Sequence, residues 1–240
     1  MSGHSKWHNI QKKKGAADAK RSSTFTKLAK GISVAARQGG GDPNFNFALR
    51  VAIDAAKGAN MPKDNIDKAI KRGTGEGGEA IIEEVIYEGF APGGLAILIK
   101  CLTDNRNRTV ADLKYLASKN GGSIGGVGSV MWMFDKKGVV TFLNPSVVTN
   151  RDEFDLAVID AGAEDIKDND GILQIICAVE DLKKVTEAVE AMDLKPDGAA
   201  IEYLAKDPVA VDDSVKEQLD QFLEILDEYD DVDSLYTNQA

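Results

Sequence analysis

The segment that organises this chain opens with Gly3-His4-Ser5-Lys6-Trp7 and closes with Met61-Pro62-Lys63-Asp64-Asn65-Ile66-Asp67-Lys68-Ala69-Ile70-Lys71-Arg72-Gly73-Thr74-Gly75. Residues 1–75 hold 15 Lys and Arg against 5 Asp and Glu, a net charge of +10 in a chain whose total is −10. Residues 76–240 therefore hold 14 basic and 34 acidic side chains, a net charge of −20. This segregation predicts a cationic module for a polyanion, joined to an acidic body.

Length and composition are typical of a soluble globular protein. The 240 residues are 43% hydrophobic and 28% charged, enough for one large domain or two to three small ones. The sequence has no run of 18 apolar residues and no apolar core behind its first charges, so we expect neither a membrane span nor a secretory signal. Cys101 and Cys177 lie in apolar runs without a CxxC partner, which predicts two reduced, buried thiols and no thiolate zinc site.

Residues 1–21 are polar and basic, with Trp7 and Ile10 as the large apolar side chains. We expect a flexible arm that orders on binding; the alternative is a solubilising tail. Trp7 favours binding, because an exposed tryptophan in a basic arm stacks on a base or docks on a partner.

Three amphipathic helices are predicted next, over residues 22–38, 44–57 and 62–73, and together they suggest a small bundle. Ser22 or Ser23 would cap the first helix, and Gly58 fits the left-handed stop of the second. The basic side chains of the first helix gather opposite its apolar stripe: Lys20, Lys27, Lys30 and Arg37. The GxGxxG match at residues 73–78 follows a helix and precedes a strand, so it is interpreted as a linker and not as a dinucleotide site.

The acidic body begins with a predicted hairpin, strands 81–88 and 95–102 joined by a Gly/Pro loop at 89–94. A helix over 110–119 follows a polar, basic island at 105–108, which is either a capped helix entry or a phosphate contact at a helix N-terminus. The glycine-rich segment 120–129 lacks the Gly-Lys pair of a P-loop and is interpreted as a flexible connection.

Residues 130–206 predict strands at 130–134 and 138–143, helix 151–161, strands 164–168 and 172–179, helix 182–192 and strand 198–206. That is βαββαβ, the ferredoxin-like order. A helix at 212–229 follows, and we expect the last strand, 232–236, to pair with the 81–102 hairpin. The acidic run Asp227-Glu228-Tyr229-Asp230-Asp231 is interpreted as a solvated face that repels phosphate from the wrong surface.

These motifs resemble one family. The resemblance is carried by Gly3 to Trp7, Asp18-Ala19-Lys20-Arg21, Phe25-Thr26-Lys27-Leu28, Ala36-Arg37-Gln38-Gly39-Gly40, Asn60 to Ile66, Ala69 to Gly75, Tyr87 to Gly94, Thr103 to Thr109 and Gly128-Ser129-Val130. Together they resemble the YebC/PmpR family, which includes the mitochondrial translational activator of cytochrome c oxidase subunit I. The similarity covers essentially the whole chain and is most specific in its first half.

The resemblance implies an α+β multidomain fold: an N-terminal three-helix domain, an α+β domain, and a ferredoxin-like domain inserted into the second. The expected parts are a basic arm (1–21), a helical domain (22–78), an α+β domain (79–129 with 207–240) and a ferredoxin-like domain (130–206). It also implies a cytoplasmic bacterial protein with no known enzymatic activity. Members are described either as DNA-binding transcriptional regulators or as ribosome-associated factors that relieve stalling, and the similarity leaves both open.

The leading hypothesis is therefore a non-enzymatic, cofactor-free regulator of gene expression that binds nucleic acid, most of all ribosomal RNA, because no recognition-helix or zinc-finger motif is present. The expected nucleic-acid contacts are Lys6, Trp7, Lys12, Lys13, Lys14, Lys20, Arg21, Lys27, Lys30, Arg37, Lys63, Lys71 and Arg72. The second contact is expected at Asn105, Arg106, Asn107 and Arg108.

Ribosomal proteins or a tRNA would meet the acidic body, and the oligomeric state is left open. The alternatives are a transcription factor on duplex DNA and a protein–protein adaptor with a basic arm. A metal site at His4 and His8 has no third ligand nearby, so none is expected.

Overall fold

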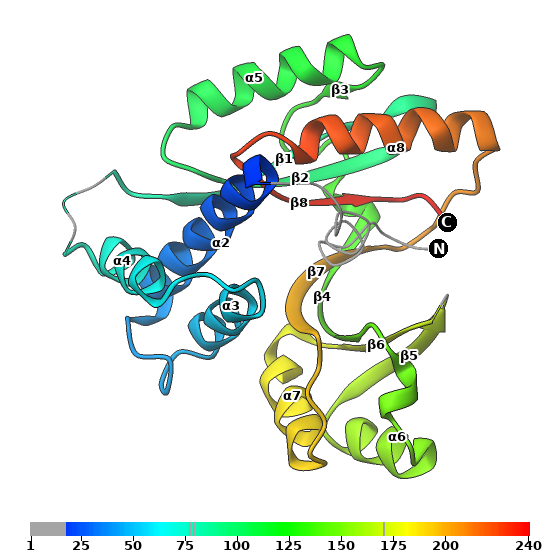
Figure 1. Ribbon diagram of the computed structural model, residues 1–240. Helices are drawn as coiled ribbons and strands as arrows, with labels where there is room; N and C mark the ends of the chain where they lie inside the picture. The colour runs from blue at the N-terminus through cyan, green and yellow to red at the C-terminus, as the bar shows by residue number, and fades with distance from the viewer. Residues whose placement is uncertain (1–17, 77, 79, 170) are drawn as a thin grey trace. The chain divides into compact units, whose positions relative to one another are not determined.

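The computed structural model describes residues 18–76, 78, 80–169 and 171–240, with the backbone alone for residues 18–22 (Figure 1). The fold is α+β, as predicted, and contains two four-stranded sheets. The chain divides into two compact units: Asp135–Leu204 forms one, and the described residues on either side of that segment form the other.

The first part of the larger unit is a three-helix bundle, made of α2 (Asp18–Gly39), α3 (Phe47–Gly58) and α4 (Lys63–Thr74). Each helix contributes one apolar stripe, which is why three short helices fold together. Ile32, Leu49 and Ala56 are fully buried at the centre, with Ile66 and Ala69 packed against them from α4.

Two predicted helix ends were wrong. Neither Ser22 nor Ser23 is the cap of the first helix, because α2 begins at Asp18 and continues through both serines. The left-handed residue after α3 is Asn60, with φ of 60°, and not Gly58, which is the last residue of the helix itself. Asparagine tolerates this conformation better than most side chains, since its short amide can hydrogen-bond locally.

Helices α2 and α4 approach each other at Gly73. A Cβ atom built on Gly73 would lie 2.3 Å from the carbonyl oxygen of Ser33 and 2.8 Å from the Cβ of Ala36. The hydroxyl of Ser33 donates a hydrogen bond across the same contact to the Ala69 carbonyl, at 2.8 Å. The end of α4 is marked instead by Gly75, which has φ of 86°. Gly73 is therefore a packing residue of the bundle.

The second part of the larger unit is a sheet of order β3-β1-β2-β8. Its strands are β1 (Glu83–Phe90), β2 (Ala96–Thr103), β3 (Ser123–Ile124) and β8 (Val232–Thr237). Strand β8 pairs antiparallel with β2, which confirms the predicted return of the last strand to the hairpin. The short helix Pro92–Gly94 closes the turn between β1 and β2.

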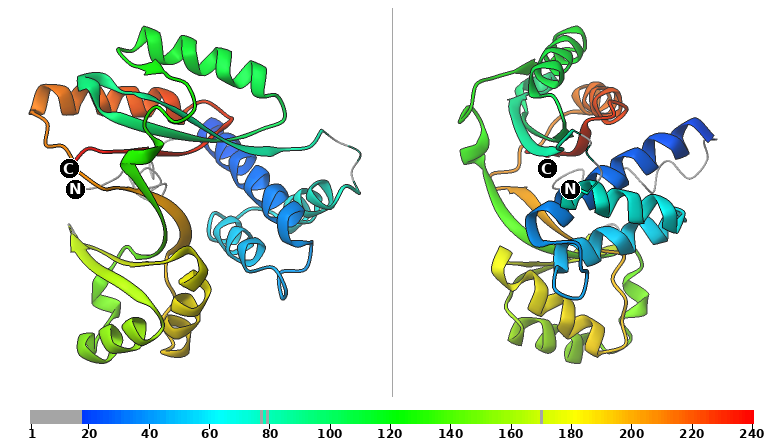
Figure 2. Two further views of the ribbon diagram at one scale, coloured as in Figure 1. Left: turned by 180° about the vertical axis from the view of Figure 1, so that it is seen from behind. Right: turned by 90° about the vertical axis from the view of Figure 1, so that its left-hand side faces the viewer.

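Helices α5 (Arg106–Lys119) and α8 (Asp213–Asp227) pack on one face of this sheet (Figures 1 and 2). Ile99 and Cys101 of β2 meet Leu113 of α5 and Leu226 of α8 in a single buried core. Because side chains alternate along a strand, Leu102 points to the other face, where it contacts Val34 of α2 and Ile82.

Two predicted boundaries beside this sheet need correction. Gly89 lies in β1 and not in the turn, since it pairs with Ile97 of β2. It is a glycine because β3 approaches so closely that a Cβ there would lie 2.2 Å from the Ser123 oxygen. Residues 131–133 form a short 3-10 helix, Met131–Met133, where a strand over 130–134 was expected. Their backbone is drawn away from strand geometry, since the N–H groups of Val130 and Met131 donate to the Glu88 carboxylate.

The unit Asp135–Leu204 has the ferredoxin-like βαββαβ order. Its elements are β4 (Phe134–Phe142), α6 (Arg151–Asp160), β5 (Ala163–Asn169), β6 (Ile172–Cys177), α7 (Leu182–Ala191) and β7 (Gly198–Ala205), with 3-10 turns at Pro145–Val147 and Val179–Asp181. The strand order is β5-β6-β4-β7. The rings of Phe142 and Phe154 meet edge to face, 5.9 Å apart, in the core between β4 and α6.

Replacing Gly73 with alanine tests the close contact between α2 and α4. We expect Gly73→Ala to lower the free energy of unfolding by about 1–3 kcal/mol, because the new methyl group overlaps the backbone of Ser33, and α2 must shift to relieve the overlap. Urea denaturation followed by far-UV circular dichroism measures the change. Gly58→Ala is the matched control: it lies in a helix with no atom within 4 Å of the added Cβ, so it should be neutral or stabilising. Equal stability of the two variants would contradict the packing role.

Candidate nucleic-acid interface

The residues predicted to contact nucleic acid fall into three groups. Lys6, Trp7, Lys12, Lys13 and Lys14 lie outside the described residues. Lys20 and Arg21 belong to the first turns of α2, of which only the backbone is described. The remaining ten lie on α2, α4 and the start of α5.

The basic face of α2 packs against an acidic segment at the end of α8. We call residues 227–231 the acidic turn. Lys27 pairs with the Asp227 carboxylate at 3.2 Å and also donates to the Asp227 carbonyl. Lys30 pairs with Asp231 at 2.6 Å and donates to the Asp230 carbonyl at 2.9 Å. The side chains of Lys27 and Lys30 keep 14% and 15% of their exposure, so the expected solvent-facing stripe is an internal contact surface.

Arg37 continues this contact by donating to the Ile82 carbonyl. The interpretation of the acidic run as a solvated face was wrong for Asp231, although Glu228 and Asp230 are exposed. Ser23 donates to the Asp230 carboxylate at 3.0 Å, and Asp231 is buried. The cause is complementary charge: the run has four carboxylates in five residues, and α2 presents its cations one and two turns apart on one face.

The carboxylate of Asp231 is the centre of a hydrogen-bond network. Besides Lys30, it accepts from Arg108 Nη2 at 2.9 Å, Thr109 Oγ1 at 2.8 Å and Thr103 Oγ1 at 3.2 Å. Burial alone would raise the pKa of Asp231, but the hydrogen bonds from Lys30, Arg108 and Thr109 outweigh it and lower the pKa to about 2. One carboxylate therefore connects α2, β2 and α5.

The polar island 105–108 is a capped helix entry whose two arginines pair with carboxylates. Asn105 is the N-cap of α5 and accepts the backbone N–H of Arg108 at 3.0 Å. Arg106 pairs with Glu83 at 2.6 Å, and Arg108 pairs with Asp104 and Asp231. Asn107 is exposed beside them. Of the two interpretations left open by the sequence, the geometry fits the structural one.

The cations of α4 are directed outward. Lys63, Lys68 and Lys71 are exposed, and none of them forms an ion pair within the described residues. Arg72 is half-buried and donates to the Ala80 carbonyl at 3.1 Å. Lys63 and Lys71, predicted contacts, are thus accessible to a ligand, whereas Lys27 and Lys30 are covered.

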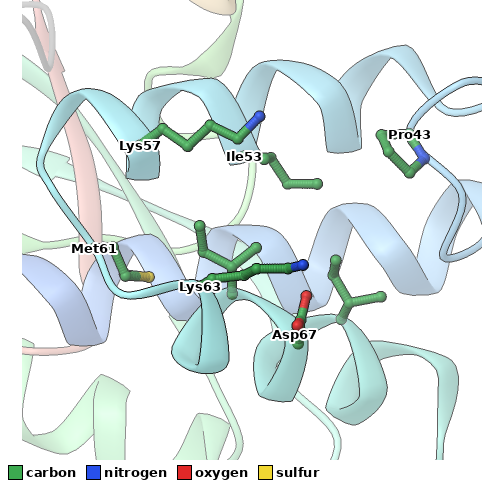
Figure 3. A pocket seen from close by; sticks show the side chains of 8 residues that line it. Pro43, Ile53, Lys57, Met61, Lys63 and Asp67 are labelled. Atoms are coloured by element: carbon green, nitrogen blue, oxygen red, sulfur yellow. The ribbon is translucent and has the colours of Figure 1, made fainter.

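A hollow of about 400 Å³ lies between α3 and α4 (Figure 3). Ile53, Ile66 and Ile70 line its apolar part, while Lys57 stands on the α3 side and Lys63 on the α4 side. Asp67 lines it as well, so the edge of the apolar floor carries two lysines and one carboxylate. A base or a sugar would lie on the floor with its phosphate beside the lysines.

The glycine-rich segment after α5 does bind an anion, but the anion belongs to the protein. The Glu88 carboxylate accepts backbone N–H groups from Gly128 at 2.6 Å, Val130 at 2.8 Å and Met131 at 2.7 Å. Burial raises the pKa of Glu88, but the three backbone hydrogen bonds lower it by a larger amount, so the pKa lies below its ordinary value. The N–H groups that a phosphate cradle would offer are therefore already used.

Neither a metal site nor a reactive thiol is found in the part of the chain that the structure describes. No group of three or more His, Cys, Asp or Glu residues there is placed to hold a metal ion, and His4 and His8 lie outside it. Cys101 and Cys177 are free and buried, as predicted. Burial raises the pKa of both thiols, that of Cys177 to about 11, which keeps them protonated at neutral pH. No helix among the described residues is long and apolar enough to cross a bilayer.

The fold and these surfaces define a class: an α+β protein in which a basic three-helix bundle, an antiparallel sheet and a ferredoxin-like unit follow one another. The chain belongs to the TACO1/YebC family. The model of the family's N-terminal domain matches residues 5–76, and the model of its second and third domains matches residues 82–239.

The relatives are similar over their whole length. A probable transcriptional regulatory protein of Desulforapulum autotrophicum is 48% identical over 238 residues, covering 99% of this chain and 96% of the relative. One of Kosmotoga olearia is also 48% identical, covering 99% and 94%. The crystal structure of a conserved hypothetical protein from Aquifex aeolicus has a TM-score of 0.85 at 38% identity, covering 95% of this chain and 93% of that one.

Sequence reasoning missed the partner of the α2 stripe and the role of Glu88. A signal for the first was present, since the acidic run and the basic stripe have opposite charge and similar length. Their separation of 200 positions left nothing local to connect them. Glu88 gave no signal, because a glutamate in a strand has no pattern that indicates a buried backbone clamp.

Replacing Asp231 tests the network at the end of α8. Asp231→Asn should lower the free energy of unfolding at pH 7 by about 2–3 kcal/mol, because Lys30 and Arg108 lose their shared counter-charge. The folded pKa is below the unfolded one, so this stabilisation is present above about pH 5 and is lost as the pH falls towards 2.

Urea denaturation of wild type and variant at pH 7 and pH 3 checks both points, with the difference at pH 3 expected at about half its value at pH 7. Asp230→Asn is the control, since Asp230 is exposed and should change stability by less than about 0.5 kcal/mol. A pH-independent difference would show that Asp231 does not act through its charge.

Proposed function

We propose that this protein is a non-enzymatic regulator of gene expression that binds nucleic acid through its basic N-terminal part. The observation that carries the proposal is the charge segregation: +10 on residues 1–75 and −20 on the remainder. Such a field attracts a polyanion to one part of the molecule and repels it from the other. The relatives named probable transcriptional regulatory proteins support a role in gene expression.

The proposed contacts combine the arm with the outer face of the bundle. Lys12, Lys13 and Lys14 give the arm three adjacent charges, and Lys63 and Lys71 are exposed on α4. Contacts of this kind hold phosphates and give salt-dependent affinity with little sequence choice. The hollow between α3 and α4 would accept a base or sugar beside them.

We favour RNA on the ribosome as the target, with relief of stalling in translation as the action. In the described bundle, Lys27 and Lys30 of α2, its longest helix, are covered by the acidic turn, so this part of α2 does not stand free as a recognition helix would before it enters a major groove. Structured RNA is read by shape, phosphates and splayed bases, which suits exposed lysines around a hollow. The acidic body would meet ribosomal proteins or a tRNA.

A DNA-binding transcriptional regulator is the second candidate. It is favoured by the names of the relatives, which are probable transcriptional regulatory proteins. It requires preference for a defined duplex sequence, whereas the ribosomal hypothesis requires binding that survives excess random duplex DNA.

Co-sedimentation with purified ribosomes across a salt series, with excess random duplex DNA as competitor, separates the two candidates. We expect retention near physiological salt. The triple variant K12E/K13E/K14E should pellet less and should reduce the slope of log affinity against log salt by about 2–3, because up to three phosphate contacts are lost.

The matched control is K136E/K183E/K195E, which makes the same change in net charge at exposed lysines of the ferredoxin-like unit. It should pellet like the wild type. Loss of wild-type protein to the DNA competitor would move the assignment to transcription, and equal behaviour of the two triple variants would remove the arm from the interface.

A further inference from the structure

The basic face of α2 holds cations that the sequence predicts to contact nucleic acid, yet the acidic turn lies on it. Three side chains of this face, Ser23, Lys27 and Lys30, bond to three aspartates of the acidic turn. The face spans about 10 Å along the helix. A phosphate backbone and the acidic turn therefore compete for the same cations.

We propose that the acidic turn is an intramolecular substitute for nucleic-acid phosphates, and that RNA binding displaces it from α2. The inference rests on the proposed function, because it adds a regulated surface to the same basic N-terminal part. The contact then acts as autoinhibition: in the closed arrangement Lys27 and Lys30 are unavailable to RNA, and in the open one they bind phosphate.

The chemistry of the acidic turn matches that of a phosphate group. Lys27 binds both a carboxylate and the carbonyl of Asp227, the last residue of α8. The C-terminal carbonyl groups of a helix carry partial negative charge, so this end of α8 attracts cations beyond its formal charges. Lys30 likewise holds the Asp231 carboxylate together with the Asp230 carbonyl.

The acidic turn keeps its other hydrogen-bond partners when the lysines of α2 leave it. When Lys30 leaves, Asp231 keeps the hydrogen bonds from Arg108, Thr109 and Thr103, so no buried carboxylate is left without a partner. The carboxylates of Asp227 and Asp230 lie near the surface, where water replaces the lost cations. The usual penalty for breaking a buried ion pair is thereby reduced.

The apolar part of the contact between α2 and the sheet is small, which also favours separation. Its apolar cluster among the described residues consists of Val34, Ile82 and Leu102, whereas the bundle and the sheet have separate large cores. The connection from α4 to β1 includes Gly75 and Gly78, both with positive φ. Small, polar contacts between separately packed parts are the ones that open and close.

The first test weakens the acidic turn without touching Asp231. D227N/D230N should bind a fluorescein-labelled oligouridylate of about 20 nucleotides at least about fivefold more tightly than wild type near 0.15 M salt. The reason is that a larger fraction of the molecules has Lys27 and Lys30 free to bind RNA. Fluorescence anisotropy measures the affinity. The control E217Q/E224Q removes two charges from exposed positions of the same helix and should bind within about twofold of wild type.

The second test locks the contact with a disulfide. Ser23 Oγ and Asp230 Oδ1 are 3.0 Å apart, so S23C/D230C brings two thiols within reach of each other. Oxidised protein should bind the oligouridylate at least about fivefold more weakly than the same protein after reduction. S23C alone should not respond to oxidation, because the natural cysteines are buried.

The outcomes separate the two hypotheses. Equal tightening by D227N/D230N and E217Q/E224Q, or equal affinity of the oxidised and reduced S23C/D230C protein, would overturn the autoinhibition. If wild type still bound RNA and lost binding in K12E/K13E/K14E, the proposed function would stand without it. If neither wild type nor any variant bound RNA, both the proposed function and the autoinhibition would be contradicted.

Discussion

A single buried carboxylate, that of Asp231, determines how the basic bundle and the acidic sheet are joined. It accepts from Lys30 of α2, from Thr103 at the end of β2 and from Arg108 and Thr109 of α5. A carboxylate at this depth is tolerable only when its hydrogen-bonding capacity is filled, and these four donors, together with the Tyr229 hydroxyl at 3.3 Å, fill it. The position of α2 on the sheet therefore depends on electrostatics more than on apolar burial.

Much of the fold could be predicted from the sequence because it depends on local periodicity. The three helices, the hairpin and the βαββαβ order follow from apolar spacing and turn residues. The return of β8 to β2 follows from the order of the elements, since the ferredoxin-like unit is complete without this strand. The errors lie where a distant segment intervenes. Gly89 resembles a turn residue, but β3 requires its missing side chain. Residues 131–133 resemble a strand, but Glu88 binds the backbone there.

The candidate site was less predictable than the fold for the same reason. The basic stripe of α2 was identified correctly as a stripe, but a charge pattern does not say whether solvent, a nucleic acid or the chain itself covers it. The acidic turn lies 200 positions away, and a single sequence carries no record of that pairing. Conversely, Lys63 and Lys71 were expected contacts, but the sequence could not show that they are exposed, because their exposure depends on how α4 packs against α2 and α3.

Two segments of the chain that could bind an anion, the glycine-rich segment and the basic face of α2, are occupied by carboxylates of the chain itself. The glycine-rich segment holds Glu88, and the basic face of α2 holds the acidic turn. The two differ in depth and in the number of donors. Glu88 is buried and accepts three backbone N–H groups, so that contact is structural. The acidic turn meets long, hydrated lysines whose charge serves a phosphate equally well, and this exchangeability makes the α2 face the regulated part of the proposed interface.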